Sequence, residues 1–295
     1  MSIQWHIPPP ELQGEVTWSP KAMPDVSVKT WYRVNGKLKG GKTPIIVVHG
    51  GPGCPHDYLL NWTEILPTGH PVIFYDQIGC GKSTRLPEDK YQPLWVEDTF
   101  IEELEHVVKH LVSDNDDGNP ARGCILAGHS LDSQESVAAA RSRIPELSSW
   151  AQKVIRECEE KDDYENEDYQ KASMEFLSRF GVDFETAPEE VRSAFDQLVS
   201  VTHVYGTMWG PSEFKCTGNL ASASLNSVVH KLAMPILVIY GTNDEIYASQ
   251  DQMIKRWTGS RAVTRVVLEG ARHLAHVDDP QVYYGAVREW LKTIG

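Results

Sequence analysis

The amino-acid sequence predicts an α/β protein with a mostly parallel central sheet. Short apolar runs, each long enough for one strand, lie at residues 44–48, 71–75, 124–127 and 234–240. Continuous apolar runs of this length are typical of strands that are buried on both faces, as in parallel sheets. A helical pattern lies between the runs at 71–75 and 124–127, and this order of strand, helix and strand favours βαβ units.

The remaining elements are predicted from periodicity and from turn residues. Residues 26–34 alternate loosely and carry β-branched and aromatic side chains, which favours a strand that ends at the turn Asn35-Gly36. Residues 96–112 carry apolar side chains at helical spacing. We also expect, in chain order, a helix at 133–143, a helix at 249–257, a strand at 262–268 and an amphipathic helix at 282–294.

Composition and charge describe an ordinary water-soluble globular chain. Its 295 residues are 41% hydrophobic and 23% charged, and its formal net charge is −13. This acidity disfavours binding to nucleic acid or to an anionic membrane, so neither is expected as a partner. The sequence contains no apolar stretch long enough for a transmembrane helix and no secretory signal. Five dispersed cysteines without a C-x-x-C pair predict reduced thiols, no zinc site and a cytoplasmic location.

A long charged segment precedes the apolar run at 234–240. Residues 146–231 are mostly helical in pattern and include the solvated run 157–163. We interpret this segment as a helical lid that is inserted into a core made of residues 1–145 and 232–295. An α/β chain of this length is often one domain with such an insertion.

Two glycine-rich stretches are similar to phosphate-binding loops. Residues 36–43 match G-x-x-x-x-G-K-[ST], but Pro44 and a β-branched strand follow where a phosphate loop requires a helix. The second stretch, residues 81–83, has Asp76 at the position of the leading glycine. We therefore expect no nucleotide at either stretch, and no metal or organic cofactor elsewhere.

The stretch from Gly123 to Asp132 predicts a strand, a sharp turn and a helix, with Ser130 at the apex of the turn. This is the layout of a nucleophile elbow, which lifts the Ser hydroxyl above the edge of the sheet. The usual pattern is G-x-S-x-G, and here Asp132 occupies the second glycine position. Gly-x-Ser also occurs in turns without chemical function. Ser130 is therefore either a nucleophile or an ordinary turn residue, and the rest of the sequence has to distinguish these alternatives.

Three polar residues follow three predicted strands in the order Ser130, Asp244, His273, which is the order of the α/β-hydrolases. A Ser hydroxyl is a poor nucleophile until a His accepts its proton, and a carboxylate orients that His. All three residues would lie at the carboxyl ends of strands, where open α/β sheets bind ligands. His276 is a nearby competitor for the role of base, but it stands farther from its strand.

A tetrahedral intermediate needs two backbone N–H donors for its oxyanion. We expect one donor at Leu131, directly after the Ser, and the other at Gly51 in the glycine loop, residues 49–53. Glycines in this loop would let the backbone approach the oxyanion closely. The alternative for the glycine loop is a plain turn.

These motifs resemble those of the proline iminopeptidase family of α/β-hydrolases, which includes related L-amino-acid amidases. The resemblance rests on His-Gly-Gly-Pro-Gly at 49–53, Tyr-Asp-Gln-x-Gly-x-Gly-x-Ser at 75–83 and Gly-His-Ser at 128–130. It extends to Gly-Pro-Ser-Glu-Phe at 210–214, Gly-Thr-Asn-Asp-Glu at 241–245 and Glu-Gly-Ala-x-His at 269–273. The family resemblance implies a serine aminopeptidase or amidase that removes an N-terminal residue, often proline, or hydrolyses an amino-acid amide.

The resemblance also implies roles for individual residues. Glu213 and Glu245 match two acidic positions that, in this family, hold the α-ammonium group of the substrate. A carboxylate pair in a partly closed pocket favours a free amine over a blocked one. Trp209 would line an apolar pocket for the substrate side chain, with core packing as the alternative. The roles of nucleophile, base and orienter of the base fall to Ser130, His273 and Asp244, respectively.

The segment after the elbow departs from the family pattern. The family has Trp-Gly-Gly after the Ser, then a long helix and an apolar strand, whereas this chain has Leu131-Asp132-Ser133 and a short helix. Because no compact apolar run lies between Leu131 and Met234, we expect one strand of the sheet to be missing. A gap one strand wide, roughly 4.8 Å, could move Asp244 out of reach of His273.

Three functional hypotheses remain open at this point. The first is a serine aminopeptidase or amidase that acts on a small peptide or an amino-acid amide. The second is hydrolysis of esters or lactones by the same fold. The third is a catalytically impaired, hydrolase-like protein that binds ligands or partners. The sequence does not predict the oligomeric state.

Overall fold

The structure is a computed structural model that describes residues 3–113, 123–130, 133–200 and 202–294. These residues form two compact units, each described by itself. One unit contains residues 2–130 and 188–208 and is called the Ser130 unit below. The other contains residues 131–187 and 209–295 and is called the His273 unit.

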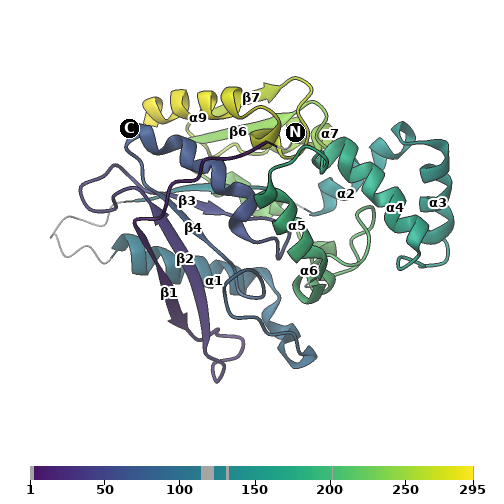
Figure 1. The fold of residues 1–295 in the computed structure, drawn as a ribbon, viewed down its shortest axis with the longest axis horizontal. Coiled ribbons are helices and arrows are strands. Elements are labelled where there is room, and N and C mark those ends of the chain that lie inside the picture. The colour runs from purple at the N-terminus through teal and green to yellow at the C-terminus, as the bar shows by residue number, and fades with distance from the viewer. Residues whose placement is uncertain (1–2, 114–122, 131–132, 201, 295) are drawn as a thin grey trace. The chain divides into compact units, whose positions relative to one another are not determined.

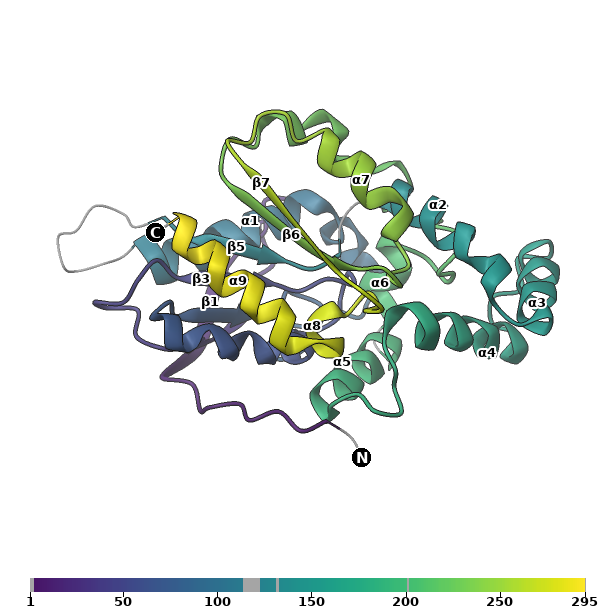
Figure 2. The same ribbon diagram turned by 90° about the horizontal axis from the view of Figure 1, so that it is seen from above.

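The Ser130 unit is built on a five-stranded sheet with the order β1-β2-β4-β3-β5. Figure 1 labels strands β1 to β4, and Figure 2 labels β5. Strand β3 pairs in parallel with both β4 and β5, whereas β2 pairs antiparallel with β4 and with β1. The sheet is thus parallel at the end that carries the elbow. The strands are β1 (Leu12–Trp18), β2 (Val28–Asn35), β3 (Ile45–Val48), β4 (Val72–Tyr75) and β5 (Ile125–Gly128).

The predicted parallel strands are confirmed, and the reason is burial. Ile45, Ile46, Ile73 and Phe74 are fully buried, as expected for strands covered on both faces. Strand β1 was not predicted. It is a weakly apolar strand in which only every second residue at its end, Val16 and Trp18, is buried.

Helices complete the Ser130 unit. Helix α1 (Glu97–Val108) continues as η3 (Lys109–Ser113) and confirms the helix predicted at 96–112. The 3-10 segment η1 (His56–Thr68) follows the glycine loop and was not predicted, because its apolar residues have no simple helical period. The other helical segments of the unit are η2 (Asp89–Leu94), α5 (Glu189–Ser200) and α6 (Thr202–Met208).

The His273 unit contains a two-stranded parallel sheet. Strands β6 (Ile236–Gly241) and β7 (Val263–Leu268) pair in register, with Ile236 opposite Val263 and Gly241 opposite Leu268. Helix α7 (Tyr247–Lys255) connects them, and α9 (Pro280–Ile294) packs against both strands (Figure 2). The short helix α8 (Ala275–Asp278) precedes α9. Each of the four elements predicted over residues 234–294 is therefore confirmed.

The helical character predicted for residues 146–231 is also confirmed. The His273 unit includes a buried apolar cluster around Tyr169, Phe176, Phe180 and Phe214. The division into a core and a lid remains a prediction, since residues 188–208 group with the five-stranded sheet. No helix in the described ranges is long and apolar enough to cross a membrane. The helical segments here are α2 (Ser133–Arg143), η4 (Ile144–Glu146), α3 (Ser149–Glu159), α4 (Glu167–Phe176), η5 (Leu177–Gly181), η6 (Asn219–Ser222), η7 (Leu225–Ser227) and η8 (Val229–Lys231).

The expected absence of a strand after the elbow helix agrees with the topology. In the described residues between β5 and β6, every regular element is helical, apart from an isolated bridge between Ser212 and Lys215. Strand β5 pairs with β3, and β6 pairs with β7 in a separate sheet. The chain therefore passes from the elbow strand into helices before it returns to β structure.

We predict that Phe176→Ala lowers the free energy of unfolding by about 3–5 kcal/mol, because it empties a fully buried site in the helical cluster. Met174→Ala is the matched control on the same helix, since Met174 is 45% exposed. Urea denaturation of both variants gives the comparison. Equal losses for the two variants would contradict this account of the cluster.

Candidate active site

Ser130 has the backbone geometry of an elbow residue. It lies two residues after the end of β5 and has a φ of 67°, in the left-handed region that residues other than glycine seldom adopt. Such strained residues cluster at functional sites, where the surrounding structure holds them in place. Leu131 and Asp132, which complete the elbow motif, lie outside the described residues.

The glycine loop lies directly against the elbow within the Ser130 unit. A Cβ on Gly50 would stand 2.7 Å from the carbonyl oxygen of His129 and 3.3 Å from the Cβ of Ser130, so only glycine allows this approach. The Tyr58 hydroxyl joins the two segments, because it accepts the Gly50 N–H at 2.8 Å and lies 3.2 Å from His129 Nδ1. Gly51 has a φ of 120°, which also favours glycine.

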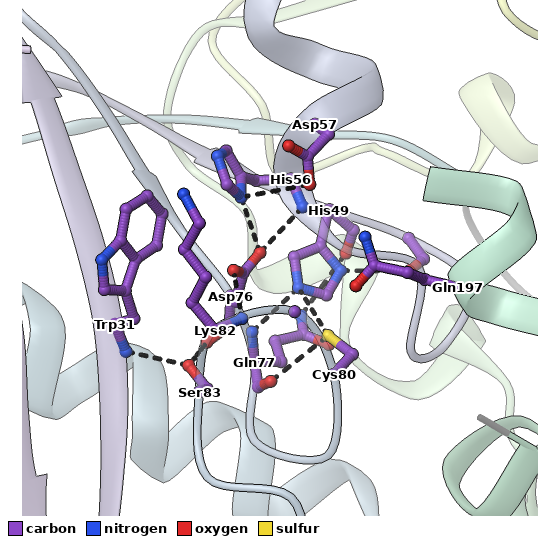
Figure 3. A network of polar contacts seen from close by, with 12 residues as sticks. Trp31, His49, His56, Asp57, Asp76, Gln77, Cys80, Lys82, Ser83 and Gln197 are labelled. Carbon is purple, nitrogen blue, oxygen red and sulfur yellow. Dashed lines mark hydrogen bonds and ion pairs between the residues drawn. The ribbon is translucent and has the colours of Figure 1, made fainter. Parts of the chain in front are cut away.

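A buried polar network that includes His49, His56 and Asp76 connects the glycine loop to the loop after β4 (Figure 3). His49 Nε2 accepts the backbone N–H of Gln77 at 2.9 Å, so the neutral ring donates from Nδ1 to the Gly50 carbonyl. Burial lowers the pKa of His49, which keeps the ring neutral. The glycine loop is thereby tied to the loop that follows β4.

The same network contains a fully buried, hydrogen-bonded pair of Asp76 and His56. Asp76 Oδ1 lies 2.7 Å from His56 Nδ1 and accepts the His56 backbone N–H at 2.9 Å. Its other oxygen accepts the Lys82 N–H at 2.9 Å. Burial raises the pKa of Asp76, but the hydrogen bonds and charge of His56 outweigh it and lower the pKa to about 2. This network was missed at the level of sequence, where Asp76 was recognised only as part of a family motif.

Asp244 and His273 form a direct hydrogen bond within the His273 unit. Asp244 Oδ1 lies 2.9 Å from His273 Nδ1 and also accepts the Ile246 N–H. The backbone N–H of His273 donates to the Phe180 carbonyl at 2.8 Å, which fixes the loop that carries the imidazole. The missing strand does not separate Asp244 from His273, because the two residues follow β6 and β7, which pair directly.

The two loops approach each other because β6 ends in glycine. A Cβ on Gly241 would stand 1.8 Å from the carbonyl oxygen of Ala271, so a side chain there would force the loops apart. That carbonyl accepts the Asn243 N–H at 2.9 Å. Arg143 on α2 donates to the carbonyl of Asp244 at 3.1 Å and adds a further tie that the sequence did not reveal.

The predicted acidic residues lie close to the same imidazole. Glu245 Oε1 is 3.9 Å from His273 Nε2. Burial lowers the pKa of His273, but the negative charges of Asp244, Glu245 and Glu213 outweigh it and raise the pKa to about 9. Burial raises the pKa of Glu245 to about 7, against the lowering effect of His273. Three carboxylates, those of Asp244, Glu245 and Glu213, therefore favour a positive charge at the His273 imidazole.

The remaining predicted residues occupy less decisive positions. Trp209 donates from its indole nitrogen to the Ser212 carbonyl at 2.8 Å, which is compatible with packing as well as with a pocket. His276, the competitor for the role of base, is buried and packs against the Tyr283 ring. No metal-binding cluster of His, Cys, Asp or Glu occurs among the residues that the structure describes.

The structure brings the predicted site residues together in two groups. Ser130 and Gly51 lie in one unit, and Asp244, His273 and the two glutamates lie in the other. Within the second group, Asp244 and His273 share a hydrogen bond and Glu245 lies 3.9 Å from the other ring nitrogen. The convergence of the two groups, the donor roles of Gly51 and Leu131, and the catalytic and binding roles of the other residues remain predictions.

Comparison with known proteins places the chain in a family. No protein-family model matches it. The proline iminopeptidase of Levilactobacillus brevis is 30% identical over 298 residues, which cover 91% of this chain and 95% of that protein. This chain belongs to the proline iminopeptidase family. The resemblance inferred from the glycine loop and the elbow is thus confirmed.

Solved structures agree with the family assignment. The crystal structure of VinJ matches with a TM-score of 0.83 at 26% identity, covering 97% of this chain and all of that one. The proline iminopeptidase of Mycobacterium smegmatis matches with a TM-score of 0.76 at 25% identity, covering 95% and 98%. The predicted α/β-hydrolase fold is therefore confirmed for this member of the proline iminopeptidase family.

We predict that Asp76→Ala lowers the free energy of unfolding by about 3–5 kcal/mol at pH 7, because it leaves the buried His56 ring without its partner. The folded-state pKa of Asp76 lies below its usual value of 3.8, so its stabilisation is present above pH 4. About 2 kcal/mol of it is lost as the pH falls toward 2.

Urea denaturation between pH 3 and pH 7 checks this prediction. Asp25→Ala serves as the control, since Asp25 is exposed and should change stability by less than about 0.5 kcal/mol. The wild-type protein and the control should lose stability more steeply below pH 4 than Asp76→Ala does. Parallel pH dependence in all three proteins would contradict the assignment.

Proposed function

We propose that this chain is a serine aminopeptidase that releases an unblocked N-terminal residue, with proline as the leading candidate, from a small peptide or an amino-acid amide. Proline iminopeptidases that match over about nine-tenths of the chain support the reaction class. One observation carries the chemistry: His273 bonds to Asp244 through one ring nitrogen and lies beside Glu245 on the other. The proposed base His273 thus contacts both the carboxylate that would orient it, Asp244, and a carboxylate that would bind the substrate ammonium, Glu245.

In the proposed reaction, Ser130 Oγ attacks the carbonyl carbon of the N-terminal residue. His273 Nε2 accepts the hydroxyl proton as the new C–O bond forms. The Asp244 carboxylate, on Nδ1, fixes the tautomer and stabilises the imidazolium. His273 then gives the proton to the leaving amine as the C–N bond breaks. A water molecule, activated by the same base, hydrolyses the resulting ester on Ser130.

The glycine loop would supply electrostatic stabilisation. Backbone N–H groups at Gly51 and Leu131 would donate to the oxyanion as negative charge develops on the carbonyl oxygen. The contact of Gly50 with the elbow supports this assignment, because it sets the spacing between the loop and Ser130. Tyr58 would hold that spacing during the reaction.

Glu213 and Glu245 would recognise the α-ammonium group of the substrate. Charge-assisted hydrogen bonds to a carboxylate are roughly twice as strong as neutral ones. A blocked N-terminus would leave the two carboxylates in a largely buried site without a cation, which disfavours it. Recognition of the amine would therefore select the terminal residue and limit the reaction to the chain end.

We predict that a fluorophosphonate probe labels Ser130, and that Ser130→Ala abolishes labelling and lowers kcat for proline p-nitroanilide by at least about 1,000-fold. Peptide mass spectrometry identifies the labelled residue. Ser133→Ala is the control, because it removes a hydroxyl three positions further along the chain that has no proposed role. A folded wild-type protein that neither reacts with the probe nor hydrolyses the anilide would instead support the catalytically impaired alternative.

We predict that Glu213→Gln lowers kcat/KM for proline p-nitroanilide by about 10- to 100-fold, mainly through KM, because a charge-assisted contact to the ammonium is lost. Hydrolysis of p-nitrophenyl acetate, which has no amine, should change by less than about threefold. Glu157→Gln on α3 controls for the change in net charge. Equal losses with both substrates would argue against ammonium recognition and in favour of a structural role.

A further inference from the structure

Carboxylates face both nitrogens of the His273 imidazole, whereas a Ser-His-Asp site needs only one. Asp244 Oδ1 lies 2.9 Å from Nδ1, and Glu245 Oε1 lies 3.9 Å from Nε2. Glu213, in the segment after α6, adds a third negative charge that acts on the ring. The side chains of His273, Asp244 and Glu245 are only 11%, 4% and 19% exposed, so solvent screens their charges weakly.

The carboxylate on the second nitrogen has a chemical consequence. Nε2 is the nitrogen that must accept the proton of the nucleophile. A carboxylate within 4–6 Å stabilises the charged form of a titrating group. Glu245 therefore favours an imidazolium that already carries a proton on Nε2 and cannot act as a base.

The arginines near this cluster of carboxylates in the described part of the chain have hydrogen-bond or ion-pair partners of their own. Arg143 on α2 donates to backbone carbonyls, and Arg272 is paired with Asp278 at 2.6 Å. Arg179 on η5 donates to the Glu146 carbonyl. The other titratable neighbour, His276 on α8, packs against a tyrosine ring. From the η5 segment, the backbone carbonyl of Phe180 accepts the N–H of His273.

We infer that Glu245 couples recognition of the substrate amine to activation of the base His273. This inference rests on the proposed function and extends it from binding to catalysis. When the substrate ammonium binds beside Glu245, it neutralises the charge that holds the proton on Nε2. The Nε2–H bond then breaks, the proton passes to solvent water, and the electron pair left on Nε2 is free to accept the proton of Ser130.

The coupling would give the site two sources of selectivity. A substrate without a charged amine loses the ammonium contact, and it also meets a base that is still protonated. Since the same ammonium that binds also activates the base, an ester that diffuses into the site would be hydrolysed slowly at neutral pH. Glu213, whose negative charge also acts on the ring, would contribute mainly to binding of the ammonium group.

The inference predicts opposite effects of Glu245→Gln on two substrates at pH 7. The kcat/KM for p-nitrophenyl acetate should rise about tenfold, because one pKa unit multiplies the neutral fraction of the imidazole tenfold. The kcat/KM for proline p-nitroanilide should fall at least about tenfold through loss of the ammonium contact. Glu269→Gln, which removes an exposed carboxylate four residues before His273, should change neither rate.

A second measurement does not require turnover. Prolinamide binding to the Ser130→Ala protein at pH 7 should release close to one proton, measured by calorimetry in buffers with different ionisation enthalpies. The His273 imidazole, followed by NMR, should titrate at lower pH with prolinamide bound than without it. Both effects should be largely lost when Glu245→Gln is added.

The outcomes separate this inference from the function on which it rests. Failure of the wild-type protein to hydrolyse the anilide or to react at Ser130 would reject the proposed function itself. With that activity present, an ester rate that stays constant or falls in Glu245→Gln would overturn the coupling alone. Prolinamide binding without proton release or a change in the His273 titration would also overturn it.

Discussion

The hydrogen bond between Asp244 and His273 is the interaction on which the proposed chemistry of this protein depends. It exists because β6 and β7 pair directly, and because Gly241 lets the loop after β6 pass against the Ala271 carbonyl. A side chain at that glycine would move the carboxylate relative to the imidazole, and a hydrogen bond does not tolerate displacements of that size. The geometry of the base is thus set by backbone packing rather than by the side chains alone.

A similar principle governs the nucleophile side. Ser130 holds a backbone conformation that is unfavourable for a residue with a side chain, and such strain persists only where the surroundings enforce it. The glycine loop and the Tyr58 hydroxyl supply that enforcement. The glycine loop is itself anchored through His49 to the loop after β4, which the buried pair of Asp76 and His56 holds in place. Buried polar groups here determine position as well as stability.

Charge around the imidazole distinguishes this site from a plain Ser-His-Asp arrangement. The orienting carboxylate stabilises the imidazolium during the reaction, but additional carboxylates stabilise it before the reaction as well. The carboxylates that would bind the substrate ammonium therefore also keep the imidazole protonated, and a protonated imidazole cannot act as a base. Substrate binding resolves this conflict if the bound cation and the ring proton compete for the same negative charge.

The sequence by itself determined the elements that depend on local pattern. Apolar runs and glycine turns predicted β2 to β7, and periodicity predicted the helices α1, α2, α7 and α9. Chain order together with motif predicted Ser130, Asp244 and His273 as the catalytic residues. Strand β1 and the segment η1 escaped, because their burial comes from partners distant in the chain.

Only the tertiary structure decided what depends on contacts between distant segments: the bond from Asp244 to His273, the approach of Glu245 to the second ring nitrogen, and the support of the glycine loop by Asp76. It also decided that the shortened segment after the elbow does not disturb the base. The physical reason is that strand pairing brings residues 29 positions apart within hydrogen-bond distance, and no local pattern records such a distance.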